Sequence, residues 1–214
     1  MSQTLLEQIH RGACQMDLDL SADQEGRLGT FIRLLAKWNR IYNLTAVRDE
    51  ESMVSQHLLD SLAVLPFLTT QPKAIRSLAD VGSGGGLPGI PLAIASPHLA
   101  VELIEASHKK ASFLQQVKIE LKLNNVSIHC GRVEDFKPMD LFDAVISRAF
   151  SSLADFVRLA AHLLGPEGRV LAMKGIHPQE EIEQLPPGWR MLQSIPLAIP
   201  ELNAQRALIV IEKT

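Results

Sequence analysis

The sequence predicts an α/β protein with a Rossmann-like fold: a mostly parallel seven-stranded sheet with an antiparallel edge hairpin, preceded by an N-terminal helical extension. Three observations support this fold. After Pro72, short β-like runs alternate with helical stretches, as when crossover helices join parallel strands. A glycine-rich turn directly follows the first of these strands. Before Pro72, apolar residues recur only at helical spacing. We expect residues 1–72 to form the extension, packed on the core, and residues 73–214 to form the ligand-binding domain.

Three helices are expected in the extension. Ser21 and Gln24 form a capping-box signature, which predicts that a long helix spans 22–42. A shorter helix over 3–14 precedes it, and a third over 53–65 is expected to stop near Pro66. One apolar stripe of the long helix should face the core: Leu28, Phe31, Ile32, Leu35, Trp38 and Tyr42.

The remainder of the chain alternates between strands and helices. Gly165 is expected to cap the last crossover helix. Two further apolar runs, at 190–197 and 206–211, are predicted to pair antiparallel at the edge of the sheet. The parallel strands are predicted at 75–81, 101–105, 126–130, 142–147 and 169–174, and the helices between them at 88–96, 107–123 and 152–164.

The bulk composition is that of a soluble globular protein, with 46% hydrophobic and 21% charged residues. Cys14 and Cys130 lie far apart without a partner at metal-ligand spacing, so neither a disulfide scaffold nor a metal site is expected.

No basic segment followed by an apolar stretch opens the sequence, and no run of about 18 apolar residues occurs. We therefore expect a cytoplasmic monomer without a membrane segment. The formal charge of −3 leaves room only for a local nucleic-acid-binding patch.

The chemistry of the chain centres on the turn Asp80-Val81-Gly82-Ser83-Gly84-Gly85-Gly86, which follows a predicted strand and precedes a predicted helix. Glycines at Gly82, Gly84 and Gly86 let the backbone turn tightly and approach a ligand closely. The stretch from Gly84 to Gly89 also fits the dinucleotide pattern G-x-G-x-x-G. In that pattern the first glycine follows the strand directly, but here Gly82 has that place and Leu87 would have to be the last glycine. Asp80 suits a ligand with a cationic amino acid moiety better than a pyrophosphate. We therefore favour S-adenosylmethionine, with Asp80 and Ser83 in its site, over a nicotinamide cofactor.

Glu105 is the candidate ribose ligand, because it closes the second strand 19 residues after Gly86. An acidic residue about 20 residues beyond such a turn meets the ribose hydroxyl pair in related folds. The segment from Arg132 to Asp135 follows the third strand, where an adenine ring would lie.

Seven motifs in order resemble the ribosomal small-subunit methyltransferase G family, also called glucose-inhibited division protein B. The motifs are WNRIYNLTAV (38–47), HLLDSL (57–62), DVGSGGGLPGIPLAI (80–94), KKASFL (109–114), RVEDF (132–136), FDAVISRAF (142–150) and MKG (173–175). The resemblance implies a class I methyltransferase fold and methylation of N7 of one guanine in the decoding-region loop of 16S rRNA, with S-adenosyl-L-methionine as donor. It also implies that the small ribosomal subunit or its precursor is the partner. By the same resemblance, the donor site includes Gly82, Leu87, Val133, Glu134 and Arg148.

Guanine N7 carries an in-plane lone pair and no proton, so its attack on a sulfonium methyl needs no general base. Placement should then dominate the rate. Arg148 cannot donate to N7 during the attack, because that bond would occupy the attacking lone pair. We expect Arg148 to contact the donor, a phosphate or O6 alone, with a structural salt bridge as the alternative.

Several other residues are candidates for contacting RNA. His57 and Asp60, three apart on a predicted helix, form a possible polar wall for the base beside Ser61, although a structural role is the better default for the histidine. Asn43 and Thr45 follow the long helix and either cap it or meet RNA. The candidate phosphate ligands are Lys109, Lys110, Lys118, Arg132 and Lys174.

Two alternative functions remain open from the residues alone. The first is a nicotinamide-dependent oxidoreductase, and the second is a non-catalytic ribosome-assembly factor with a vestigial donor pocket. Aromatic residues make up 5% of the chain, and Trp38 and Tyr42 are expected in the core, so no platform for stacking bare single strands is evident.

Overall fold

The structure, a computed structural model, describes residues 3–72, 74–148, 150, 152–175 and 178–214. Seven strands form one sheet in the order β3-β2-β1-β4-β5-β7-β6. The first five strands pair in parallel, and β7 is antiparallel to both β5 and β6. This confirms the predicted fold class, including the antiparallel edge pair. The strands are β1 (Ser77–Val81), β2 (Ala100–Glu105), β3 (Val126–Cys130), β4 (Phe142–Ser147), β5 (Leu164–Lys174), β6 (Trp189–Pro196) and β7 (Ala207–Lys213).

The strand order reverses between β1 and β4. From β1 the chain proceeds outward to β2 and β3, and then returns to place β4 on the other side of β1. The carboxyl ends of β1 and β4 therefore border the crevice in which open α/β sheets bind ligands. At that point the hydroxyl of Ser147 donates to the carbonyl oxygen of Val81 over 2.7 Å, which ties the two strand ends together.

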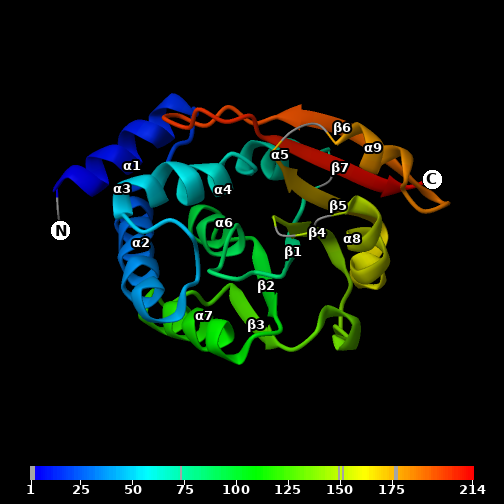
Figure 1. Ribbon diagram of the computed structural model, residues 1–214, viewed down its shortest axis with the longest axis horizontal. Helices are drawn as coiled ribbons and strands as arrows, with labels where there is room; N and C mark the ends of the chain where they lie inside the picture. The colour runs from blue at the N-terminus through cyan, green and yellow to red at the C-terminus, as the bar shows by residue number, and fades with distance from the viewer. Residues whose placement is uncertain (1–2, 73, 149, 151, 176–177) are drawn as a thin grey trace.

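Helices cover both faces of the sheet (Figure 1). On one face α1 to α7 share a single hydrophobic cluster with Leu78, Leu103 and Ile146, and on the other α8 packs against Val145 and Ile104. One core thus joins the N-terminal helices to the sheet; the predicted domain start at residue 73 lies outside the described residues. The helices are α1 (Gln3–Gln15), α2 (Ala22–Tyr42), α3 (Glu50–Met53), α4 (Asp60–Leu62), α5 (Leu65–Thr70), α6 (Gly89–Ala95), α7 (His108–Glu120), α8 (Leu153–Ala160) and α9 (Gln179–Glu183).

The capping box that begins α2 is confirmed. Ser21 Oγ accepts from the backbone N–H of Gln24, and the side chain of Gln24 accepts from the backbone N–H of Ser21. The apolar stripe of α2 is buried as expected as far as Leu35, and Trp38 is half-buried. Tyr42 is 41% exposed, so its predicted place in the core is wrong. Tyr42 is the last residue of α2. Trp38, one turn earlier, packs against Phe113 of α7, whereas the ring of Tyr42 packs on Trp38 of its own helix.

The helix predicted to stop near Pro66 ends at Leu62, and Pro66 lies in the first turn of the next helix, α5; proline is tolerated there because the first turn leaves its N–H groups unpaired anyway. The predicted cap of the last crossover helix is wrong. Gly165 does not cap a helix, because α8 ends at Ala160 and a 3-10 turn leads directly into β5 at Leu164. The longer strand pairs Leu164 with Phe142 and so includes Gly165.

The segment between α3 and α4 forms a π-helix, Val54–Leu59, which the apolar spacing did not predict. Such wide turns inside helices are rare and occur frequently at functional sites. Helix α9 was also missed, since none of its residues is buried and it has no apolar stripe to reveal it.

Candidate active site

The glycine turn after β1 has the backbone conformation that its sequence predicts. Gly82, Gly84 and Gly86 adopt φ angles of 73°, 57° and 80°, a left-handed region that residues with a Cβ rarely enter. The backbone N–H groups of Gly82 and Ser83 both donate to the carbonyl oxygen of Ile104, at 2.9 and 3.2 Å. The turn is therefore fastened to the end of β2.

The turn has an inner and an open side. A Cβ on Gly86 would lie 2.6 Å from Ile90 Cγ1, so this glycine is required for packing against α6. A Cβ on Gly84 would have only the Gly82 carbonyl oxygen within 4 Å, at 3.8 Å, so Gly84 faces open space. The hydroxyl of Ser83 donates to the carbonyl oxygen of Asp80, and the side chain of Leu87 belongs to the core. Gly84 thus leaves room for a ligand against its backbone.

Asp80 is completely buried at the end of β1. Its Oδ2 accepts from the backbone N–H of Gly89 at 2.9 Å, whereas its buried Oδ1 has no hydrogen-bond partner among the described residues. Burial raises the pKa of Asp80 to about 7, and the nearby Glu105 adds to the effect. A buried acceptor without a partner is costly, so Oδ1 is suited to a donor group of a ligand.

Glu105 lies at the carboxyl end of β2 and is 6% exposed. Its Oε2 accepts from the backbone N–H of Gly84, and its Oε1 accepts from that of Ser107, both at 2.8 Å. These two bonds fix the carboxylate beside the glycine turn. Each oxygen retains a lone pair, so hydroxyl donors of a ribose can still be accepted.

Val133 and Glu134 belong to a short 3-10 helix, Val133–Asp135, after β3. The side chain of Val133 is buried, whereas Glu134 is exposed. The structure thus places these two residues at the carboxyl edge of the strand next to β2, on the same edge as Glu105. This is the relative position that the sequence predicts for residues beside an adenine ring.

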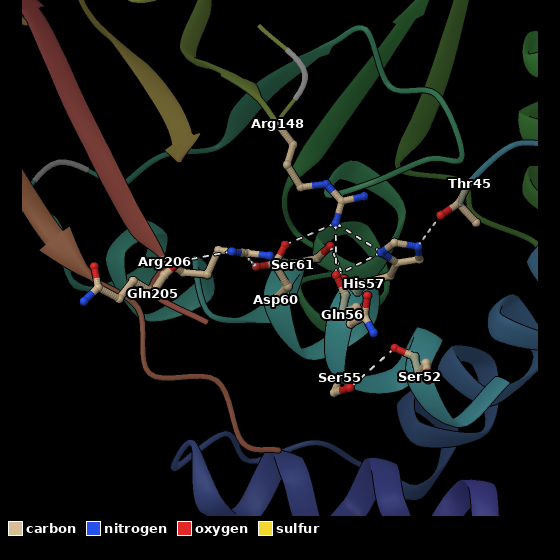
Figure 2. A network of polar contacts seen from close by, with 10 residues as sticks. All are labelled: Thr45, Ser52, Ser55, Gln56, His57, Asp60, Ser61, Arg148, Gln205 and Arg206. Atoms are coloured by element: carbon tan, nitrogen blue, oxygen red, sulfur yellow. Dashed lines mark hydrogen bonds and ion pairs between the residues drawn. The ribbon is translucent and has the colours of Figure 1, made fainter. Parts of the chain in front are cut away.

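Arg148 lies directly after β4 and points toward the N-terminal helices (Figure 2). Its Nη1 donates to Oδ2 of Asp60 at 3.1 Å, and Oδ1 of Asp60 accepts from Nε of Arg206 at the same distance. Asp60 is 1% exposed, while the side chains of Arg148 and Arg206 are 27% and 30% exposed. One buried carboxylate therefore joins three segments that are far apart in the sequence.

His57 extends this network on the side of the loop after α2 (Figure 2). Its Nδ1 lies 2.9 Å from the carbonyl oxygen of Gln56, which can only accept, so Nδ1 carries the proton. Its Nε2 then accepts from the hydroxyl of Thr45 at 2.6 Å. Burial lowers the pKa of His57 to about 4, with a further contribution from Arg148. His57 is therefore neutral near pH 7, and both of its ring nitrogens are engaged.

The other candidate residues are more scattered. Asn43 caps the end of α2 in a left-handed conformation and accepts from Arg48, away from the Arg148 network. Lys174 donates to both carboxylate oxygens of Glu181 and to the carbonyl oxygen of Phe150, so it is not free to bind a phosphate as predicted. Lys109 and Arg132 are exposed, and Lys110 and Lys118 are half-buried.

Sequence reasoning missed Arg206. It lies in an irregular stretch before β7, where a single arginine has no periodicity or motif to distinguish it. Only the strand pairing of β7 with β5 brings it near Asp60. The backbone carbonyl of Gln56 was missed for a related reason, since a backbone acceptor leaves no signature in side-chain identities.

The comparisons with known proteins agree with this geometry. The model of the family described as rRNA small subunit methyltransferase G matches residues 24–210, a longer stretch than the seven motifs span. The chain belongs to this family. A relative named ribosomal RNA small subunit methyltransferase G from Aromatoleum aromaticum is 55% identical, with 100% of each chain covered. Another of the same name, from an Azoarcus species, is 52% identical over 94% of this chain and 93% of its own.

Solved structures show the same fold at low sequence identity. An O-methyltransferase from Streptomyces achromogenes, in complex with S-adenosylmethionine, gives a TM-score of 0.58 at 18% identity, covering 86% of this chain and 89% of its own. An O-methyltransferase from Bacillus cereus gives 0.59 at 17% identity, covering 86% and 91%. Within the described residues, no helix is long and apolar enough to cross a membrane.

Proposed function

We propose that this chain methylates N7 of a guanine in the decoding-region loop of 16S rRNA, using S-adenosyl-L-methionine as donor. Membership in the methyltransferase G family makes it a donor-dependent methyltransferase and displaces both the oxidoreductase and the assembly-factor alternatives. The observation that carries the donor site is the fully buried Oδ1 of Asp80, which has no partner in the described part of the chain, in the same turn as the open backbone of Gly84.

The residues around the turn fit the parts of the donor. Asp80 would bind the cationic amino acid end of the donor, which would lie against the backbone of Gly82 and Gly84. Glu105 would accept hydrogen bonds from the ribose hydroxyls. Val133 and Glu134 would flank the adenine. When bound, the donor supplies an electrophilic sulfonium methyl group; the protein has to orient the base toward it and exclude water.

The network around Arg148 suits a reaction that needs no proton transfer. His57 is neutral with both nitrogens engaged, and Asp60 is neutralised by two arginines. Neither group is a free general base, in accord with the absence of a proton on guanine N7. Arg148 retains exposed surface and has N–H groups left to donate, so it would orient the target through O6 or a phosphate.

The direct test is transfer of tritiated methyl to small ribosomal subunits from a bacterial strain that lacks its own enzyme of this family. We expect one methyl group per 16S rRNA, at N7 of a single guanine of the decoding-region loop. Deproteinised 16S rRNA, a precursor particle and the mature subunit are compared to identify the substrate form. Label on a different atom or base, or no label on any of the three, would refute the proposal.

A short unstructured oligonucleotide should be a poor substrate, and methyl transfer should weaken as the salt concentration rises.

Donor affinity should rise as the pH increases through about 7, because the cationic donor needs the ionised form of Asp80, whose pKa burial raises to about 7. Each pH unit below that pKa should cost up to about tenfold in affinity.

The effect of Asp80 ionisation on the stability of the fold has the opposite sign. Since the folded pKa exceeds the unfolded value of 3.8, protonation stabilises the fold most at pH values below 3.8, and this contribution is lost as the pH rises through about 7.

Calorimetric titration with S-adenosylmethionine, one pH unit below and one above that pKa, measures the effect. Asp80→Asn is the control: it should bind weakly at both pH values, with no slope. An equal slope in Asp80→Asn would show that another group is responsible.

A further inference from the structure

Tyr42 is an exposed aromatic residue at the end of α2, the helix whose Leu35 packs against the glycine turn. Its ring packs on that of Trp38, with centroids 5.2 Å apart, and 41% of the residue remains exposed. Neither the donor site nor the Arg148 network uses it. A half-exposed tyrosine on a rigid tryptophan is a surface on which a nucleic acid base stacks.

The position of Tyr42 relative to the active site follows from two chain connections. Leu35, two helical turns earlier on the same stripe, packs against the glycine turn: a Cβ on Gly85 would lie 3.1 Å from Leu35 Cδ1. Thr45, three residues later, contacts His57, which lies within 3.5 Å of Arg148. Tyr42 is therefore about 10 Å along the helix axis from the residue that packs on the glycine turn.

Two basic residues, Lys109 and Arg48, are connected to Tyr42 through its neighbours in the structure. Trp38 contacts the ring of Phe113 in α7, with centroids 5.6 Å apart, and Lys109 is one turn from Phe113 toward the beginning of α7. Helix α7 begins shortly after the carboxyl end of β2 and packs against α2, so Tyr42 and Lys109 are both connected to the Trp38–Phe113 contact. Arg48 donates to the amide oxygen of Asn43, the residue that follows Tyr42 in the sequence.

The charges of this surface complement a phosphodiester backbone. Residues 28–48 contain four Lys or Arg and no Asp or Glu, and the acidic run 49–51 follows them. Among the described residues, neither Arg48 nor Lys109 forms an ion pair; the acceptors of Arg48 are the Asn39 carbonyl and the Asn43 amide oxygen. These cations are therefore not neutralised by the protein itself, which favours an RNA strand over an apolar protein partner as the occupant.

We propose that Tyr42, Arg48 and Lys109 form an RNA-binding surface on which an unpaired base close to the target guanine stacks on Tyr42 while the two cations bind neighbouring phosphates. This inference rests on the proposed function and specifies how its substrate is held. Stacking on Tyr42 keeps the strand at the mouth of the crevice, so the base beside it can enter toward Gly84. The surface provides affinity for RNA and takes no part in donor binding.

The test compares Tyr42→Ala, Tyr42→Phe and wild type in methyl transfer to small ribosomal subunits that lack the modification. Tyr42→Ala should raise KM for the subunits on the order of tenfold, with kcat and the Kd for S-adenosylmethionine unchanged. Tyr42→Phe keeps the ring and should recover most of the lost affinity. Leu192→Ala is the matched control, since Leu192 is 40% exposed but lies in β6 at the far edge of the sheet. Its KM should equal that of wild type.

Three results would overturn this inference while leaving the proposed function intact, because wild type still methylates the subunit in each. The first is an unchanged KM in Tyr42→Ala. The second is a loss of donor affinity as large as the loss of RNA affinity, which indicates a structural role. The third is another occupant of the surface. Ultraviolet cross-linking of the complex should attach Tyr42 or Trp38 to a nucleotide. Attachment to a ribosomal protein contradicts the RNA assignment, as does a wild-type dimer in sedimentation that Tyr42→Ala abolishes. Failure of wild type to methylate any form of the RNA would instead refute the proposed function.

Discussion

Replacing Gly84 with alanine should reduce affinity for S-adenosylmethionine on the order of a hundredfold, or about 3 kcal/mol. Two effects combine. The φ angle of 57° strains any residue with a Cβ, and the new methyl group would occupy the open space into which the backbone of Gly84 faces. Calorimetric titration of the purified variant with the donor measures the loss.

Gly188→Ala separates the two effects. Gly188 also has a left-handed backbone, with φ of 84°, and a Cβ there would have no heavy atom within 4 Å. It precedes β6, away from the turn, so its substitution should cost comparable stability with unchanged donor affinity. If both variants bind the donor equally well, the turn is not the donor site.

Arg148→Ala should retain the fold and lower kcat/KM for methyl transfer on the order of a hundredfold, the usual cost of a misplaced reacting group. The physical reason is that Arg148 is the one arginine of the Asp60 pair that lies directly after β4, at the switch point of the sheet. Steady-state transfer to small ribosomal subunits measures the effect, and full activity in the folded variant would exclude a role in the site.

Arg206→Ala is the control for a structural salt bridge. Both variants leave buried Asp60 with one arginine, and the two side chains are similarly exposed, so both should lose about 1–3 kcal/mol of stability. If the Arg148 salt bridge were only structural, the two variants would lose activity equally. We expect Arg206→Ala to keep most of its activity, because Arg206 points to the opposite side of Asp60 (Figure 2).

The sequence was most informative where one local rule determined the structure. The alternation after Pro72 predicted the five parallel strands, and two apolar runs predicted the antiparallel edge pair. The glycine pattern placed Gly82, Gly84 and Gly86 in a tight turn, where all three have positive φ angles. Asp80 and Glu105 were placed beside this turn from spacing alone, because parallel strands bring their carboxyl ends together. Motif resemblance added Arg148.

Features that depend on long-range packing could not be predicted. The burial of Tyr42 was overestimated because the apolar stripe shows which way a residue faces but not where its packing partner ends. The pairing of Lys174 with Glu181 depends on the missed helix α9, whose residues are all at least partly exposed. Arg206 meets Asp60 across 146 residues, and only the insertion of β7 between β5 and β6 brings them together.

Leu35 packs against Gly85, which makes one side of the glycine turn part of the core that α2 forms. Any fluctuation that lifts α2 from the sheet would hydrate that side and distort the turn. A ligand that binds only the form in which α2 is packed on the sheet shifts the equilibrium toward that form and so suppresses the fluctuation. Amide hydrogens in the middle of α2 should then exchange with solvent more slowly once the donor is bound.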